Sequence, residues 1–358
     1  MAVTIKDVAR EANVSVASVS RALNGSANVM EVTRQRILGV AEKLRYVPHS
    51  AARSLITRRT QTVGALLPDL FGEFFSELIR GIDLAARARG LHLLVSSSHG
   101  NPSEAAKALR SMQGRVDGVL VMSPHVDARF LTEHLSEGLP AVLINTVAHT
   151  NKYPTLNIDN YGGALSMTRH LLAGGYESIA FVGGPDGNFD ASERLRGFND
   201  AIAESETPVR SRVLCGDFTE ESGYRLAKKL HAAGTLPRAV FAANDTMAIG
   251  MLLALNESGV RVPDDVALAG FDDIPIARFV NPPLTTVRVR IADLGRCALE
   301  ELAVELDIAT PGEAIDDKPS CYIVVRASCG SANQSAAVSG DVGSSASKKE
   351  IEIPGRRV

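Results

Sequence analysis

The sequence predicts an all-α helix-turn-helix headpiece at the N-terminus, joined to an α/β body of two lobes. Two observations support this fold class. Residues 4–24 contain two short amphipathic helical patterns separated by a tight turn. Residues 61–330 alternate short apolar runs with helical patterns, which is typical of βαβ units and parallel sheets.

The distribution of charge supports the same division. Residues 1–60 hold ten Lys and Arg against four Asp and Glu, a net charge of +6. The remaining residues hold 28 against 37, a net charge of −9, so the total of −3 hides a basic head on an acidic body. Such asymmetry is expected when a nucleic-acid-binding module is attached to a domain that should not bind phosphate.

The first two helices of the headpiece are marked by their capping residues. Thr4 suits an N-cap, and Asp7 places a carboxylate in the first turn, a variant of the capping box. Asn13 suits the turn because it tolerates a left-handed backbone, and Ser15 is the expected N-cap of the second helix. The predicted buried residues of both helices are Val8, Ala9, Ala12, Val19, Ala22 and Leu23.

The opposite face of the second helix is the predicted recognition surface. It presents Val16, Ala17, Ser18 and Arg21. Short side chains near a helix N-terminus let the backbone approach base edges in a DNA major groove, and Arg21 can reach guanine or phosphate. The alternative is a generic helical hairpin that uses alanine for packing.

A third helix completes the predicted headpiece. Its expected apolar face is Val32, Ile37, Val40, Ala41 and Leu44, and it ends before Val47-Pro48, because the residue before proline disfavours helix. Met30 is a poor cap at its start. Gly39 in its interior costs about 0.5–1 kcal/mol relative to alanine.

The body is predicted to contain buried strands that alternate with helices. About 270 residues exceed one comfortable core, which favours two lobes with a ligand at the carboxyl ends of the strands. The expected strands are 63–67, 91–96, 118–122, 141–144, 179–183, 212–215, 239–242 and 266–270, with helices that include 74–89, 104–113, 162–173 and 246–258.

The headpiece resembles that of the LacI/GalR family of bacterial transcriptional regulators. The resemblance rests on Thr-Ile-Lys-Asp-Val-Ala at residues 4–9, on Val-Ser-x-x-Ser-Val-Ser-Arg at residues 14–21 and on Tyr-x-Pro at residues 46–48, and it continues to about residue 329. It implies that Thr4, Ser15, Asn24 and Tyr46 contribute to DNA binding. It also implies that Val16 and Ala17 set operator preference on a pseudo-palindromic site with a central CG step.

The same resemblance assigns residues 49–60 as a hinge helix. This segment is too short to be stable alone in water, and in the family it folds on DNA beside its twin from a second subunit. Leu55 matches the leucine wedged into a minor-groove step, and Ala52 packs beside it. His49 stands where asparagine is common, and the alternative is that this segment is a basic linker.

For the body, the resemblance implies a periplasmic-binding-protein-like fold in which the chain crosses between the lobes three times. Residues 1–48 are the headpiece and 61–330 are the effector-binding and dimerisation domain. The N-lobe is expected at about 61–158 plus 288–318, and the C-lobe at about 159–287 plus 319–330. Residues 331–358, rich in Ser, Ala, Gly and Lys, are expected to form a disordered tail.

Polar and aromatic residues near the strand ends are the expected ligand contacts. They include Phe74, Phe75 and Asn145, and the resemblance to the family adds Arg194, Phe218, Asn244 and Asp272. Aromatic faces stack on the C–H groups of a sugar ring, and Asn, Asp and Arg bind its hydroxyls. Core packing is an alternative for one of the two neighbouring phenylalanines. For Asp159, the sequence favours a helix cap over a ligand contact.

Several classes of function lack support. The sequence contains no HExxH, GxSxG or Walker A pattern, no metal spacing among Cys215, Cys297, Cys321 and Cys329, and no apolar run of membrane-spanning length. We therefore expect no cofactor, no metal, no enzymatic activity and no membrane partner. The four cysteines are expected to be buried, reduced thiols in a cytoplasmic protein that joins the nucleoid when bound to DNA.

The sequence thus predicts a homodimeric transcriptional regulator, in the first place a repressor, whose affinity for an operator in double-stranded DNA changes when a sugar-like effector binds between the lobes. The direction of that change is not encoded in any motif. The alternatives are a cleft that takes a purine-like ligand or a protein cofactor, and a sugar-acting enzyme fused to a DNA-binding head.

Overall fold

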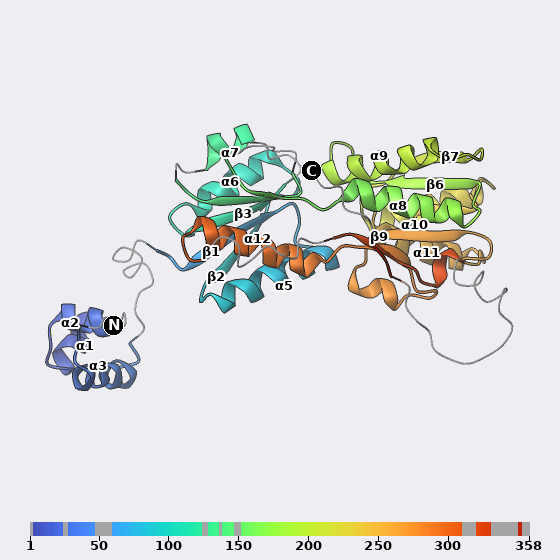
Figure 1. Ribbon diagram of the computed structural model, residues 1–358. Helices are drawn as coiled ribbons and strands as arrows, with labels where there is room; N and C mark the ends of the chain where they lie inside the picture. The colour runs from blue at the N-terminus through green and yellow to red at the C-terminus, as the bar shows by residue number, and fades with distance from the viewer. Residues whose placement is uncertain are drawn as a thin grey trace. The chain divides into compact units, whose positions relative to one another are not determined.

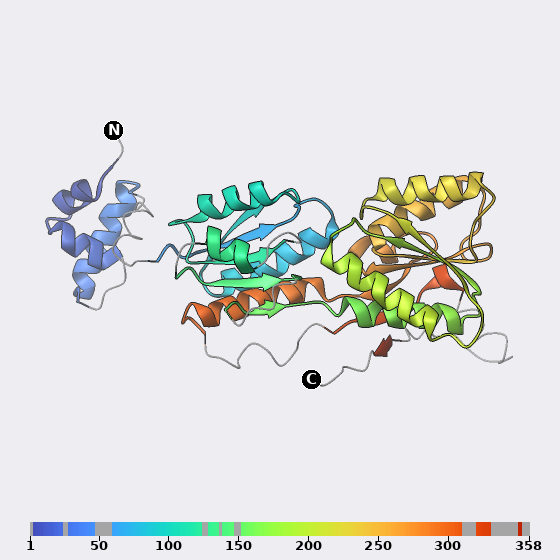
Figure 2. The same cartoon turned by 90° about the horizontal axis from the view of Figure 1, so that it is seen from above.

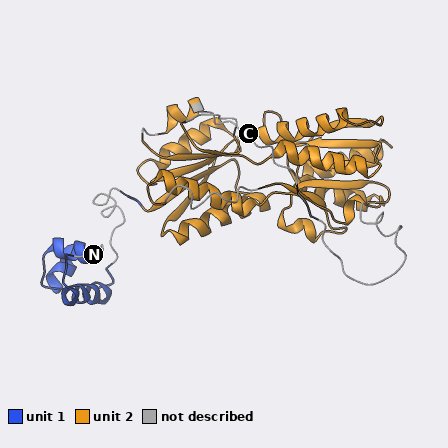
Figure 3. Ribbon diagram, viewed as in Figure 1, with its two compact units in different colours: residues 1–60 blue, residues 61–358 orange. Residues whose placement is uncertain are grey.

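The computed structural model describes residues 3–23, 28–46, 59–123, 128–135, 138–146, 152–309, 320–330 and 350–352. The chain forms two compact units, residues 1–60 and 61–358 (Figure 3). The larger unit contains one parallel sheet and one mixed, mainly parallel sheet, with helices on their faces (Figure 1). The two-lobed α/β fold class predicted from the sequence is therefore confirmed.

The first unit is a three-helix headpiece made of α1 (Ile5–Glu11), α2 (Val16–Leu23) and α3 (Glu31–Lys43). Its core includes Val8, Val19 and Ile37, each fully buried. The prediction that Val32 faces this core is wrong, because 83% of its surface is exposed. Ile37 lies five positions after Val32, and at 3.6 residues per turn that spacing directs the two side chains to different faces of the helix.

The N-lobe is a five-stranded parallel sheet in the order β2-β1-β3-β4-β5 (Figure 1). Its helices α5 and α12 cover one face and α6 and α7 the other. Alternate residues of each strand enter opposite cores, so that Leu67 packs with the α5 side and Leu66 with the α6 side. The strands are β1 (Thr62–Leu67), β2 (His92–Ser97), β3 (Gly118–Met122), β4 (Ala141–Ile144) and β5 (Thr155–Leu156); the helices are α5 (Glu73–Ala88), α6 (Pro102–Met112), α7 (Ala128–His134) and α12 (Ile291–Glu305).

Glycines let α5 and α12 pack at close range. A Cβ on Gly81 would lie 1.9 Å from the carbonyl oxygen of Ala292, and one on Gly295 would lie 2.4 Å from that of Leu78. The two helices come from opposite ends of the body sequence yet contact each other along the N-lobe (Figure 1). The N-lobe is therefore completed by a helix made after most of the C-lobe.

The C-lobe is built on a seven-stranded sheet in the order β12-β11-β10-β9-β8-β6-β7. Helices α8 and α9 pack together on one face and α10 and α11 on the other (Figure 2). The strands are β6 (Ser178–Gly183), β7 (Arg210–Cys215), β8 (Ala239–Ala242), β9 (Ala267–Asp272), β10 (Thr285–Arg288), β11 (Tyr322–Val324) and β12 (Glu350–Glu352). The helices are α8 (Asn160–Ala173), α9 (Phe189–Ala203), α10 (Glu220–Ala232) and α11 (Asp245–Glu257), with short 3-10 turns η1 (Pro275–Arg278) and η2 (Ala327–Cys329).

Three features of this lobe differ from the sequence-based expectation. Strand β7 is not buried on both faces, because it is the edge strand of the sheet. Cys215 at its end is exposed, whereas Cys297, Cys321 and Cys329 are buried, and none of these four cysteines is in a disulfide. Residues 350–352 form an antiparallel strand beside β11, so the expectation of a wholly disordered tail is wrong for these three residues. The Glu-Ile-Glu alternation is compatible with an edge strand.

None of the helices in the described part of the chain is long and apolar enough to cross a membrane. Among the same residues, no group of three His, Cys, Asp or Glu side chains is placed to hold a metal ion.

Candidate functional site: a recognition helix and a pocket between two lobes

The N-terminal part of α2 presents exposed side chains on the surface of the headpiece. The Ser15 hydroxyl accepts a hydrogen bond from the backbone N–H of Ser18 at 3.1 Å, and the two serine hydroxyls lie 2.9 Å apart. Ser15 therefore caps α2, as its sequence position predicts. Val16, Ala17 and Arg21 are exposed on this helix, while Ser18 is half-buried.

The other predicted DNA-binding residues differ in their surroundings. Both the backbone N–H and the hydroxyl of Thr4 donate to the Asp7 carboxylate, at 2.9 and 2.7 Å, which lowers the pKa of Asp7. Tyr46 is half-buried against the headpiece core. Asn24, Ala52 and Leu55 lie outside the described residues.

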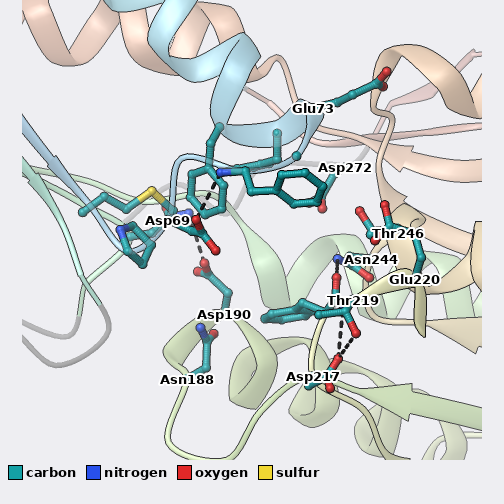
Figure 4. Close-up of a pocket in the computed structure, with 18 of the residues that line it drawn as sticks. Asp69, Glu73, Asn188, Asp190, Asp217, Thr219, Glu220, Asn244, Thr246 and Asp272 are labelled. Atoms are coloured by element: carbon teal, nitrogen blue, oxygen red, sulfur yellow. Dashed lines mark hydrogen bonds between the residues drawn. The ribbon is translucent and has the colours of Figure 1, made fainter. Parts of the chain in front are cut away.

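The second site is a pocket of about 330 Å³ in the larger unit (Figure 4). Its walls come from both lobes, at the carboxyl ends of the parallel strands of the two sheets, where ligands of open α/β folds bind. All seven residues predicted as ligand contacts line it: Phe74, Phe75, Asn145, Arg194, Phe218, Asn244 and Asp272.

Arg194 is the central cation of the pocket and only 3% of its surface is exposed. Its Nε donates to Asn160 Oδ1 at 2.7 Å, one Nη to the carbonyl of Ala243 at 2.5 Å and the other to Asp272 at 2.9 Å. The guanidinium also lies 3.8 Å from the centre of the Phe271 ring. Three of its five N–H groups are therefore committed to fixing it in place.

Two carboxyls beside Arg194 have raised pKa values. Burial raises the pKa of Asp272 to about 6, and the positive charge of Arg194 opposes that rise. Burial also raises the pKa of Asp190, which lies deep in the pocket with part of its surface open to the cavity. Asp190 accepts hydrogen bonds from the side-chain amides of Asn160 at 2.7 Å and Asn145 at 3.4 Å.

Hydrogen bonds cross between the lobes at two points of the pocket wall. Asn145, which follows β4 in the N-lobe, donates to Asp190 of α9 in the C-lobe. Its backbone is left-handed, at φ 48°. Glu73, the first residue of α5, accepts the backbone N–H of Ile276 in η1 at 2.8 Å. The pocket therefore has polar groups that hold its two sides at a defined separation.

Aromatic side chains form the apolar part of the lining. Phe74 and Phe75 meet edge to face, with ring centroids 5.4 Å apart, and both also pack against the core. Phe218 has φ 70° and its carbonyl accepts from the Asn244 side chain at 3.0 Å. Asn244 also caps α11 through Met247 N–H at 2.9 Å. These contacts fix both Phe218 and Asn244 before any ligand binds.

Other residues that line the pocket were not predicted from the sequence. Asp69 lies two residues after the end of β1, so the strand-end rule could have found it. Asp190 stands one helical turn before Arg194 on the same face of α9. Phe71 is exposed over 78% of its surface and lies at the pocket edge. Asp159 does not line the pocket. It caps α8 by accepting the Gly162 N–H at 2.8 Å, which is the interpretation that the sequence favours.

Comparison with known proteins yields matches to both units. Residues 4–49 match the model of bacterial regulatory proteins of the lacI family, and residues 168–329 match a periplasmic binding protein-like domain. Catabolite control protein A of Priestia megaterium is 35% identical over 322 residues, 89% of this chain and 97% of that protein. The transcriptional regulator GalR of Salmonella typhimurium is 34% identical over 299 residues, 83% of this chain and 87% of that protein.

Solved structures of transcriptional regulators match over nearly the whole chain. A lac repressor dimer bound to operator and an anti-inducer is 25% identical with a TM-score of 0.79, covering 92% of this chain and 99% of that one. A complex of the transcriptional regulator CelR with cellobiose is 30% identical with a TM-score of 0.64, covering 91% of this chain and 99% of that one.

Proposed function

Because the chain belongs to the lacI family of bacterial regulatory proteins, it is a DNA-binding transcriptional regulator rather than an enzyme, and we propose that it is a homodimeric repressor controlled by a small polyhydroxylated effector. The observation that carries the effector proposal is the pocket itself. It combines aromatic faces with many hydrogen-bond acceptors and is lined from both lobes.

The hydrogen-bonding balance of the pocket favours a ligand that brings its own donors. Carboxylates dominate the polar lining, and most donors of Arg194 and Asn244 are used within the protein. Sugar hydroxyls donate to such acceptors, while the C–H faces of the ring stack on Phe74, Phe75 or Phe218. The related regulator CelR forms a complex with cellobiose, which belongs to the same chemical class.

For DNA, we propose that two headpieces of a dimer read the halves of a pseudo-palindromic operator, as a two-fold site requires. Val16 and Ala17 would contact base edges, since they are the exposed residues directly after the cap of α2. Leu55 and Ala52 would act in a hinge that orders on DNA. Effector binding would shift the protein between two states of different operator affinity.

The DNA part is tested by selecting operators from a random duplex pool and measuring affinity by fluorescence anisotropy. A double variant with Val16→Ala and Ala17→Val should lose the preference for the selected operator while keeping salt-dependent binding to random DNA. The control is Val32→Ala on the exposed side of α3. Equal operator preference in the double variant and the wild type would refute the readout assignment.

The effector part is tested by a thermal-shift and calorimetry panel of sugars, sugar phosphates and purines, followed by operator binding with each hit. Phe71→Ala should weaken binding of a hit, whereas Phe279→Ala should not. Both phenylalanines are exposed, over 78% and 70% of their surfaces, but only Phe71 lines the pocket. A hit that leaves operator affinity unchanged would argue against effector control.

A further inference from the structure

Acidic side chains dominate the charge of the pocket. Seven carboxyl groups line it, against the one guanidinium of Arg194. That guanidinium forms an ion pair with Asp272, so the pair as a whole carries little net positive charge that could attract an anionic ligand. Of the other carboxyl groups, Asp217 pairs with Arg225 and Asp190 lies beside Arg194, whereas Asp69, Glu73, Glu220 and Glu221 make no ion pair with any residue in the described part of the chain.

Helix N-termini at the pocket could in principle favour an anion. Helices α5, α9, α10 and α11 all begin at its wall, and each N-terminus is equivalent to roughly half a positive charge. Three of the four are already capped from within, however. The side chains of Asn188, Thr219 and Asn244 accept the N–H groups of Ala191, Ser222 and Met247 at 3.0, 3.1 and 2.9 Å.

The first turns of these helices also carry acids that offset the helix dipole. Glu73 stands in α5, Asp190 in α9, and Glu220 and Glu221 in α10. Four half-charges amount to about +2, which is less than the negative charge of the lining carboxylates. The pocket therefore combines capped helix N-termini with an excess of acceptors, the opposite of a phosphate site.

From this balance we infer that the pocket takes an uncharged or amine-bearing polyol and excludes phosphorylated sugars and other anions. The inference rests on the proposed effector function and specifies its ligand class. Asp69, Glu220 and Glu221 line the pocket and are exposed, so they would repel an approaching anion, whereas Asp190 is only partly exposed and would meet a bound ligand. An ammonium group on the ligand would replace the missing cationic partner of these acids.

The test measures the charge preference of the pocket without knowledge of its ligand. In a Cys215→Ala background, which removes the one exposed thiol among the described cysteines, Phe71→Cys places a thiol at the pocket edge. Its modification rates with a cationic and an anionic methanethiosulfonate reagent of similar size are compared. The reference is Ser111→Cys in the same background, an exposed position on α6 outside the pocket.

We expect the cation-to-anion rate ratio at residue 71 to exceed the ratio at residue 111 by about tenfold at low ionic strength and to shrink with added salt. Glu220→Gln combined with Glu221→Gln should lower the ratio at residue 71. A ratio at residue 71 no larger than that at residue 111, or one that the two glutamine substitutions leave unchanged, would overturn the assignment.

The ligand panel gives an independent check. A phosphorylated sugar that binds more tightly than its unphosphorylated parent would also overturn the inference, while the proposed effector function would stand. Conversely, a hit that leaves operator affinity unchanged would count against effector control alone, because the thiol-modification ratio does not depend on DNA binding.

Discussion

Arg194 and Asp272 form an ion pair at 2.9 Å in which only 4% and 8% of the two side chains are exposed. They come from α9 and the end of β9, so the pair joins two elements of the C-lobe at the floor of the pocket. An ion pair buried this deeply stabilises the fold only as a unit, because removal of one partner leaves the other charge uncompensated.

The first prediction follows from this pair. Arg194→Met should lower the free energy of unfolding of the larger unit by about 3–5 kcal/mol, because it strands the Asp272 carboxylate. Arg196→Met is the matched control two residues along the same helix. Its exposed ion pair with Glu193 should contribute less than about 1 kcal/mol. Chemical denaturation of both variants checks the contrast, and equal losses would contradict it.

The second prediction concerns pH. Because burial raises the pKa of Asp272 to about 6, the folded state holds this proton more tightly than the unfolded state does. Its ionisation therefore reduces the free energy of unfolding as pH rises from about 4 to about 6, by up to roughly 3 kcal/mol, with no further change above that range.

Asp272→Asn removes this titration and serves as its own control across pH. The unfolding free energy of the wild type minus that of the variant should fall between about pH 4 and 6 and stay flat from pH 7 to 8. The unpaired Arg194 in the variant adds an offset that does not depend on pH. A difference that rises with pH in that range would mean that Asp272 is held in its charged form.

The third prediction separates folding from DNA reading in α2. Val19 is fully buried, whereas 41% of Val16 is exposed three residues away. Val19→Ala should destabilise the headpiece by about 2 kcal/mol through lost burial and an unfilled cavity. Val16→Ala should change its stability by less than about 0.5 kcal/mol yet weaken operator preference. Thermal melts of the isolated headpiece, followed by circular dichroism, measure the effect on stability, and operator titrations measure the effect on DNA binding. Similar melting temperatures for the Val19→Ala and Val16→Ala headpieces would refute the assigned faces.

The fourth prediction uses two helical glycines. Gly39 in α3 has no atom within 4 Å of an added Cβ, so Gly39→Ala should stabilise the headpiece by about 0.5–1 kcal/mol. Gly81→Ala would instead place a Cβ 1.9 Å from the Ala292 carbonyl and should force α5 and α12 apart. Hydrogen exchange measured by mass spectrometry should then show faster exchange in both helices. Unchanged exchange rates would show that α5 and α12 can move apart to accommodate the added Cβ without being destabilised.

Local sequence rules predicted those parts of the fold that depend on neighbouring residues. The caps at Thr4 and Ser15, the left-handed Asn13 and strands such as β3, β4 and β8 follow from chain-local chemistry. The exposure of β7 and the pairing of β12 could not be predicted in this way, because the position of a strand within a sheet depends on contacts distant in sequence.

The pocket shows the same division. Its seven predicted residues come from strand ends and from a family motif, and they line one cavity. The role of Asp190 was missed because its partners Asn145 and Asn160 lie 45 and 30 residues away in the chain. Only the folded arrangement of both lobes reveals that acceptors outnumber donors there.

The position of α12 also bears on the order in which a nascent chain can fold. The headpiece has its own core and is complete once residue 46 has been made, but the N-lobe sheet lacks Leu294 and Leu299, which are fully buried, until α12 emerges. At about 5–20 residues per second, that delay is on the order of 10–50 s. A chain released from the ribosome before α12 is made would therefore have a folded headpiece attached to a body whose N-lobe is incomplete.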